Sequence, residues 1–152
     1  MDTFALKPRS VAVVGAAETT QMGLIPDMSQ LGLHFDCALN AMEDAGLKPS
    51  DIDGVAAGEE DVATLANMLG IVPRWIDATD VGGCSYMIHV RHAAAAIAAG
   101  YCHTVLITHG ESGRSRVGSP GYNPSPASPT GQFEAPYGVT GAPSMFTIPV
   151  LR

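Results

Sequence analysis

The stretch Ala93-Ala-Ala-Ala-Ile-Ala-Ala99 places the strongest constraint on the fold. It continues a helical pattern that begins at Ser85, and it is apolar on nearly every side. A helix that is apolar all round is a buried helix, packed between other elements. Gly100 follows and is expected to end the helix. The sequence therefore predicts a layered fold with this helix, residues 85–99, in its interior.

Short apolar runs alternate with helical patterns along the first 112 residues. The runs are predicted as strands at 11–15, 52–57, 75–79 and 104–108. Besides the alanine-rich helix, helical spacing follows a cap at Ser29 or Asp27 and again covers residues 62–69. Alternation of strand and helix predicts an α/β fold with a mostly parallel sheet.

The rest of the chain has a different composition. Residues 113–152 hold seven of the eleven prolines and only four charged side chains. A loop of about forty residues is long for a compact domain. We therefore divide the chain into an α/β half-domain, residues 1–112, and a Pro/Gly-rich loop region, residues 113–152, which we expect to be extended and mostly without regular structure.

Composition and charge exclude several classes of protein. Apolar residues make up 46% of the 152 residues and charged residues 15%, which excludes general disorder. No apolar run reaches the ~18 residues of a membrane span. The net charge of −7 argues against nucleic acid as the main partner. Three cysteines without an export signal predict reduced thiols and a cytoplasmic location.

Cys84 is the residue of greatest chemical interest. It lies in Gly82-Gly83-Cys84-Ser85, at the turn into the alanine-rich helix. The free N–H groups and dipole of a helix N-terminus stabilise a thiolate, which would make Cys84 a nucleophile. A small cysteine that only fills space at the start of the helix is the alternative.

The histidines give weaker signals. His89 and His92 lie five and eight residues after Cys84, too far along the helix to serve as its base. No third ligand stands near this pair, so we expect no metal site. His109 follows the strand at 104–108, and ligands bind at the carboxyl ends of strands in open α/β sheets. It is therefore a candidate substrate-binding residue, with a structural histidine as the alternative.

Several segments, in order along nearly the whole chain, together resemble the thiolase superfamily and, within it, the sterol carrier protein-type and lipid-transfer-type thiolases. They are Val11-Ala-Val-Val-Gly15-Ala-Ala-Glu18-Thr19, Asp44-Ala-Gly-Leu-Lys-Pro-Ser-Asp-Ile-Asp-Gly54, Ala93 to Gly100, Val105-Leu-Ile, Gly110-Glu-Ser112, Gln132-Phe-Glu-Ala-Pro-Tyr-Gly138 and Pro143-Ser-Met145. Members of that family are more than twice this length. The resemblance implies a thiolase-like layered fold of which this chain is the N-terminal half plus the start of the loop region.

The resemblance also implies chemistry on the carbon–carbon bonds of acyl-CoA thioesters, with coenzyme A as part of the substrate and no tightly bound cofactor. Thiolases use a cysteine at the start of the central helix. Counted back from Gly100 without a gap, that position is Gly83, and Cys84 needs a shift of one residue. The segment Gly82 to Ser85 is more similar to lipid-transfer-type relatives that lack the nucleophile, among them retro-aldolases of steroid side chains.

Three functions remain open at this stage. The favoured one is the nucleophile-lacking retro-aldolase type; the others are a Cys84-dependent thiolase and a non-catalytic half that binds a partner. We expect a full-length enzyme, with these 152 residues inactive alone. The resemblance implies Met145 as a second substrate-binding candidate, and a small zinc-ribbon/OB-fold protein as a possible partner. It also implies a homodimer or larger assembly, whose interface includes Trp75, Ile76, Asp77, Ala78, Thr79 and Tyr86.

Overall fold

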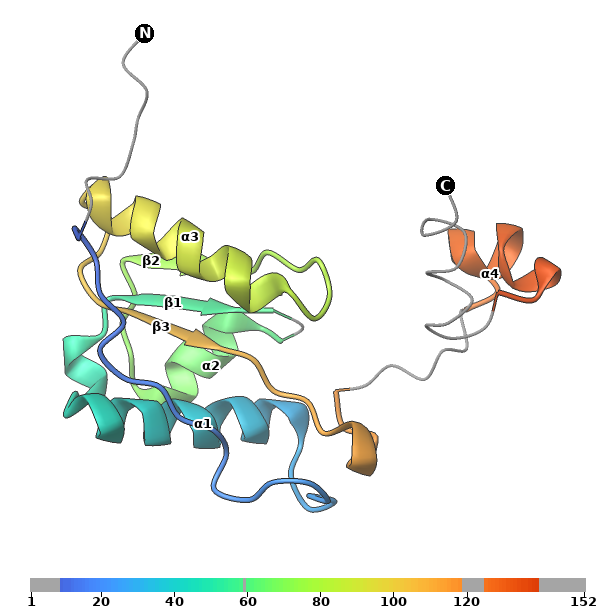
Figure 1. Cartoon of the computed structure of the whole chain (residues 1–152), viewed down its shortest axis with the longest axis horizontal. Coiled ribbons are helices and arrows are strands. Elements are labelled where there is room, and N and C mark those ends of the chain that lie inside the picture. The colour runs from blue at the N-terminus through green and yellow to red at the C-terminus, as the bar shows by residue number, and fades with distance from the viewer. Residues whose placement is uncertain (1–8, 59, 119–124, 140–152) are drawn as a thin grey trace, which may run out of the picture. The chain divides into compact units, whose positions relative to one another are not determined.

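The computed structural model describes residues 9–58, 60–118 and 125–139. They fall into two units that divide after Gly118 (Figure 1). The predicted substrate-binding residue Met145 lies outside the described residues. None of the described helices is long and apolar enough to cross a membrane.

A small parallel sheet forms the centre of the first unit. In its described part it holds three strands: β1, Gly54–Ala57, lies between β2, Trp75–Asp77, and β3, Val105–Thr108. Val55 pairs with a residue of each neighbour in parallel register. This is the mixed α/β architecture with a parallel sheet that the sequence predicts, and each strand lies within or at the edge of its predicted run.

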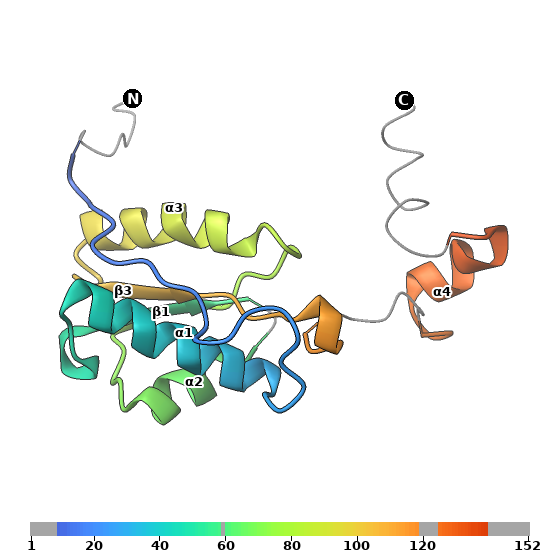
Figure 2. The same cartoon turned by 60° about the horizontal axis from the view of Figure 1, so that its bottom comes forward.

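Helices cover both faces of the sheet. Figure 2 shows α1, Gln30–Ala45, and α2, Val62–Leu69, on one face, and α3, Ser85–Ala98, on the other. A short 3₁₀ helix, Pro49–Asp51, leads into β1. The ends of α1 are set by local chemistry, since the Ser29 hydroxyl accepts a hydrogen bond from the Gly32 N–H at 3.0 Å and Gly46 ends the helix with a φ of 67°.

The apolar core lies between the sheet and the pair α1 and α2. β1 is buried over its whole length, as expected for the central strand of a parallel sheet. Its core neighbours include Ala38, Met42, Leu65 and Leu106. The other face of the sheet carries α3, which buries its small residues Ala93, Ala94 and Ala96. α3 also leaves larger apolar side chains partly exposed, namely Tyr86, Met87 and Val90.

The predicted strand at 11–15 is wrong for this chain. Residues 11–15 form no strand ladder, and the Val13 side chain is 80% exposed. A strand needs a neighbouring strand to pair with its backbone, and the described residues place none beside this segment. Gly15 instead packs directly on α1, where an added Cβ would lie 2.7 Å from the carbonyl oxygen of Ala41.

The loop region holds more regular structure than predicted. A 3₁₀ turn, Gly113–Ser115, ends the first unit. Within residues 125–139 lie a short helix α4, Pro129–Phe133, and a 3₁₀ helix, Ala135–Tyr137. Local capping explains α4, because the Gly131 N–H donates to the Ser128 hydroxyl at 3.0 Å and Pro129 stands at the start of the helix, where its missing N–H costs nothing.

Candidate functional site

The carboxyl end of β3 carries the residues of a candidate site. Because the three described strands are parallel, their carboxyl ends meet at one edge of the sheet, where α/β proteins bind ligands. β3 ends at Thr108 and continues through His109, Gly110 and Glu111 to Ser112. The structure therefore places the predicted residue His109 directly after the strand, as expected.

His34 of α1 lies beneath this strand end. It is fully buried, and its Nδ1 lies 2.8 Å from the hydroxyl of Thr108. Burial, reinforced by the nearby His109, lowers the pKa of His34 to about 4. Its Nε2 has no hydrogen-bond partner among the described residues. The ring of His34 is therefore neutral at physiological pH.

Close packing of the backbone fixes His34 in this position. A Cβ at Gly110 would lie 2.6 Å from Cδ2 of His34, so the turn after β3 needs a glycine. Sequence analysis missed His34 because an isolated histidine carries no motif. Its spacing was the available signal, since it lies three residues after Leu31 and four before Ala38, on the face of α1 that the apolar residues share.

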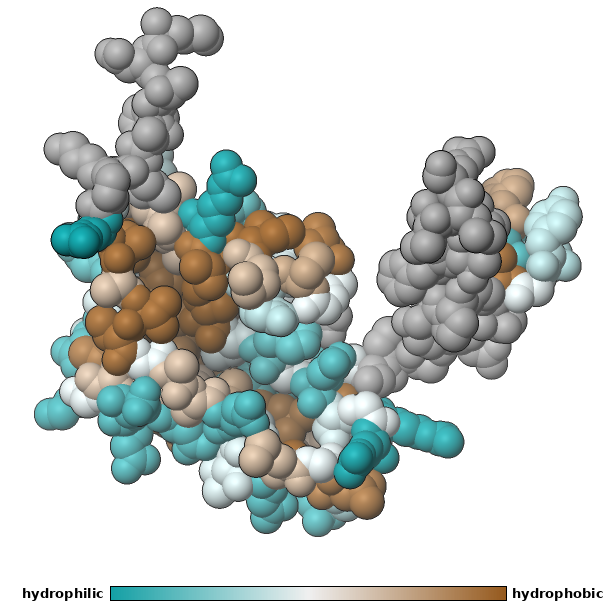
Figure 3. Space-filling view, in the orientation of Figure 1, coloured by the Kyte–Doolittle hydropathy of each residue, from teal (hydrophilic) through white to brown (hydrophobic). Residues whose placement is uncertain are grey.

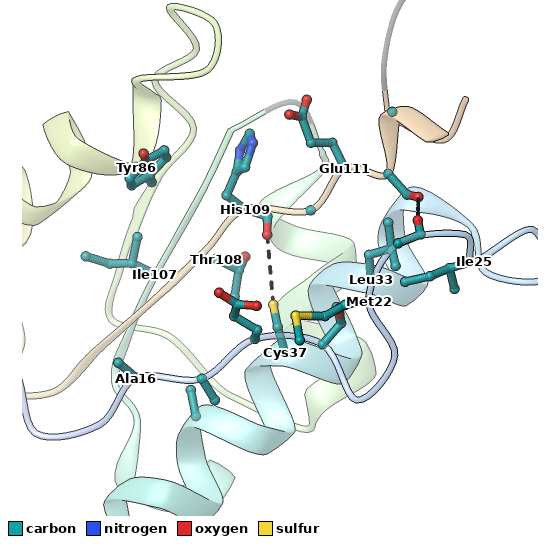
Figure 4. A pocket seen from close by; sticks show the side chains of 18 of the residues that line it. Ala16, Met22, Ile25, Leu33, Cys37, Tyr86, Ile107, Thr108, His109 and Glu111 are labelled. Atoms are coloured by element: carbon teal, nitrogen blue, oxygen red, sulfur yellow. Dashed lines mark hydrogen bonds between the residues drawn. The ribbon is translucent and has the colours of Figure 1, made fainter. Parts of the chain in front are cut away.

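A cavity of about 630 Å³ opens beside β3 (Figure 4). Its volume lies in the usual range for ligand pockets. It extends from the strand end along the outer edge of β3, between α1 and α3. Its lining combines apolar side chains with a polar rim, and the residues labelled in Figure 4 are Ala16, Met22, Ile25, Leu33, Cys37, Tyr86, Ile107, Thr108, His109 and Glu111.

Three side chains of the cavity define its chemistry. The half-buried His109 faces Tyr86 of α3, with the ring centroids 5.5 Å apart. The Cys37 thiol of α1 lies 3.3 Å from the carbonyl oxygen of His34 and 4.0 Å from that of His109, and it can donate to either (Figure 4). Burial, with the nearby Asp36 carboxylate, raises the pKa of Cys37 to about 11. Cys37 is therefore held as a neutral thiol, unsuited to nucleophilic attack, while His109 and Tyr86 offer polar groups to a ligand.

Cys84 lies at the N-cap of α3, as predicted, but not in the cavity. Its side chain is exposed, and its Sγ lies 3.9 Å from the carbonyl oxygen of Val81. The histidines of α3 are engaged elsewhere, since Nε2 of His89 lies 2.9 Å from the Thr79 carbonyl oxygen and Nδ1 of His92 lies 2.6 Å from the Asp77 carboxylate. Among the described residues the thiol of Cys84 has no imidazole partner.

The predicted dimer residues occupy two places. Trp75, Ile76 and Asp77 form β2, which pairs with β1 on one side and is an edge strand of the described sheet. The Ile76 side chain is exposed. Tyr86 instead faces His109 near β3, at the opposite edge. The structure thus separates Tyr86 from the strand with which it was grouped, and the interface stays a prediction.

Comparison with known proteins identifies the class of fold to which this chain belongs. No family model matches the chain. An acetyl-CoA acetyltransferase from Methanothermobacter thermautotrophicus is 29% identical over 157 residues, a match that covers 95% of this chain and 39% of that protein. An Ltp2-ChsH2(DUF35) aldolase structure has a TM-score of 0.66 with 25% identity and covers 90% of this chain and 37% of that one.

A monomeric SCP2-thiolase-like protein from Mycobacterium smegmatis has a TM-score of 0.53 with 27% identity. It covers 62% of this chain, while this chain covers 22% of it. The fold is therefore the thiolase-like α/β fold. Together with the acetyltransferase match, these likenesses show that the chain is related to the thiolase superfamily. It spans about two fifths of the length of the curated relative.

Proposed function

We propose that this chain supplies the N-terminal half of a thiolase-superfamily enzyme that cleaves a carbon–carbon bond of an acyl-CoA thioester by retro-aldol chemistry, without a cysteine nucleophile. The supporting observation is the position of Cys84. The thiol is exposed at the N-cap of α3, lies outside the cavity, and has no imidazole partner among the described residues. The likeness to an aldolase over 90% of the chain favours the same chemistry.

The reaction needs no oxidant or nucleophile. Loss of the proton from the hydroxyl of a 3-hydroxyacyl-CoA allows the bond between C2 and C3 to break, which gives a carbonyl compound and the enolate of a shorter acyl-CoA. Protonation of that enolate at carbon then gives the shorter acyl-CoA, so that all atoms and charges are accounted for. In this proposal His109 and Tyr86 line the end of the substrate site at β3, and residues outside this chain complete it. Coenzyme A enters as part of the substrate.

Assembly belongs to the same proposal. The open edge of β2 and the exposed Ile76 fit a homodimer or larger assembly in which β2 lies near the two-fold axis. A small zinc-ribbon/OB-fold protein is the proposed second partner, because the aldolase neighbour is named as a complex with ChsH2(DUF35). Three free cysteines support a reducing, cytoplasmic location.

The test uses the complete protein that contains this chain, with its partner. A 3-hydroxyacyl-CoA should be cleaved to a carbonyl compound and a shorter acyl-CoA, and the Cys84→Ser variant should keep most of this activity. Mass spectrometry after incubation with an acyl-CoA should find no acyl adduct on Cys84. An adduct that disappears in Cys84→Ala, with thiolytic cleavage of a 3-ketoacyl-CoA, would instead establish a Cys84-dependent thiolase. Absence of both cleavage reactions would instead favour the third function, a non-catalytic half that binds a partner.

A further inference from the structure

The chain reverses direction shortly after β3, in a tight turn made by residues 112–117. The backbone of Ser112 exchanges two hydrogen bonds with the backbone of Val117, at 2.7 and 3.1 Å. Two arginines, Arg114 and Arg116, lie between these residues, and both are exposed. We call this segment the arginine turn. It carries two guanidinium groups, two residues apart, beside the candidate site.

The serines of the arginine turn fix it to the rest of the unit. The buried Ser112 donates from its hydroxyl to the Gly23 carbonyl oxygen at 2.9 Å. The Ser115 hydroxyl accepts a hydrogen bond from the Ile25 N–H at 2.6 Å. These bonds join residues 89 and 90 positions apart in the chain, so tertiary contacts hold the turn in place. The turn is therefore a firm support for the two exposed arginines.

Arg116 has a backbone conformation that favours glycine. Its φ is 57° and its ψ is 31°, in the left-handed region that residues with a side chain rarely adopt. A glycine at this position would be free of the strain. Strained residues that their surroundings hold in place cluster at functional sites. The reason for an arginine here therefore lies in its side chain.

The two guanidinium groups have no ion-pair partner among the residues that the structure describes. Glu18 and Glu111 line the neighbouring cavity, but neither forms an ion pair with Arg114 or Arg116. Figure 3 shows strongly hydrophilic side chains at the end of the first unit where the turn lies. The whole chain has only eight lysines and arginines and a net charge of −7. An anionic ligand therefore needs local positive charge to overcome the field of the protein.

Arg114 connects the turn with the cavity. Among the described residues that line the cavity of about 630 Å³, it is the one lysine or arginine. His109 lies five residues earlier, so the backbone between the two spans at most about 17 Å. The pantetheine arm of coenzyme A bridges a distance of this order between its thioester and its phosphates. A thioester beside His109 would thus bring the phosphates within reach of the arginines.

We propose that Arg114 and Arg116 bind the phosphate groups in the coenzyme A part of the substrate. The inference rests on the proposed function, which supplies coenzyme A as the ligand. Arginine suits this role because its planar guanidinium donates two parallel hydrogen bonds to a phosphate. Both side chains are exposed and free of a competing carboxylate among the described residues, so both forks are open to the ligand.

The test measures binding to the complete protein that contains this chain, by isothermal titration calorimetry. The double variant Arg114→Gln/Arg116→Gln should bind coenzyme A and adenosine 3′,5′-bisphosphate about tenfold or more weakly than the wild type. Pantetheine has no phosphate and should bind both proteins equally. Inorganic phosphate should displace the bisphosphate only at much higher concentration. Displacement at equal concentration would assign the arginines to free phosphate and overturn the inference.

Two further variants separate ligand binding from folding and from net charge. Arg91→Gln removes an exposed arginine of α3 that lies outside the cavity, and it should leave the affinity for coenzyme A unchanged. Arg116→Gly removes the side chain and the backbone strain together. Its urea midpoint should be unchanged or higher, while its affinity for coenzyme A should still fall.

Steady-state kinetics gives a second readout. The double variant should raise KM for a 3-hydroxyacyl-CoA about tenfold or more with little change in kcat, and KM for the matching pantetheine thioester should stay the same. Failure of the wild type to bind coenzyme A, equal affinity of the double variant, or an equal loss for pantetheine would each overturn the inference. Weaker coenzyme A binding by the variant of a protein that cleaves no acyl-CoA would count against the proposed reaction and not against this site.

Discussion

The buried imidazole of His34 should make the stability of the chain depend on pH between the pKa of this group in the folded protein and its ordinary value. The pKa of His34 is about 4 in the folded protein, whereas the ordinary value for a histidine is 6.5. Burial is the larger cause of this difference, and the charge of the nearby His109 is the smaller one. As the pH falls below 6.5, the unfolded chain binds a proton at His34 and the folded chain does not. The contribution of His34 to the free energy of unfolding is therefore complete above pH 6.5 and is lost progressively as the pH falls to about 4.

The size of the effect follows from the two pKa values. A difference of 2.5 between them corresponds to about 3 kcal/mol over the full range, at 1.36 kcal/mol for each unit. Between pH 7 and pH 5 the loss should be about 2 kcal/mol in the free energy of unfolding. Urea denaturation of the 152-residue chain at the two pH values, followed by circular dichroism, measures it directly.

Two variants separate His34 from the other titrating groups. His34→Gln keeps a polar side chain within reach of the Thr108 hydroxyl but removes the titration, so its unfolding free energy should lose about 2 kcal/mol less than the wild type between pH 7 and pH 5. His103→Gln changes an exposed ring and should retain the contribution of His34. Equal pH dependence in His34→Gln and the wild type would show that this imidazole is protonated, or accessible to water, in the folded state.

Three further changes test the packing around the sheet. Gly110→Ala should destabilise the chain by about 1–3 kcal/mol, measured by urea denaturation, because the new Cβ would meet the ring of His34. Asp53→Asn should cost about 1–3 kcal/mol at pH 7, because this carboxylate accepts hydrogen bonds from the backbone N–H groups of Thr104 and His103 and from the His103 imidazole. Burial raises the pKa of Asp53, but these hydrogen bonds more than offset the effect of burial and hold the pKa at about 2. The contribution of Asp53 to stability should therefore disappear as the pH falls from about 4 to 2. Ser29→Ala should lower the thermal midpoint through a loss of about 1 kcal/mol at the N-cap of α1, and an unchanged midpoint would mean that the cap is dispensable.

Local chemistry in the sequence was sufficient for the helices of the first unit. Glycines at positions 46 and 70 end α1 and α2 with positive φ, and the capping residues Ser29 and Asp61 begin them. These signals act within one turn of the chain, so they need no information about distant residues. Short apolar runs likewise predicted β1, β2 and β3. The reason is clearest for β1, which is buried over its whole length and has the apolar composition of a central parallel strand.

Tertiary structure decided whatever depends on a neighbour that is distant in sequence. The valine run at 11–14 has the composition of a strand, yet pairing requires a second strand beside it, and the described residues supply none. The candidate site shows the same limit. Sequence placed His109 at the end of a strand, but the approach of Tyr86, the burial of His34 and the position of Cys84 outside the cavity follow from how α1 and α3 pack on opposite faces of the sheet. Those contacts join residues tens of positions apart, and no local pattern in the chain records them.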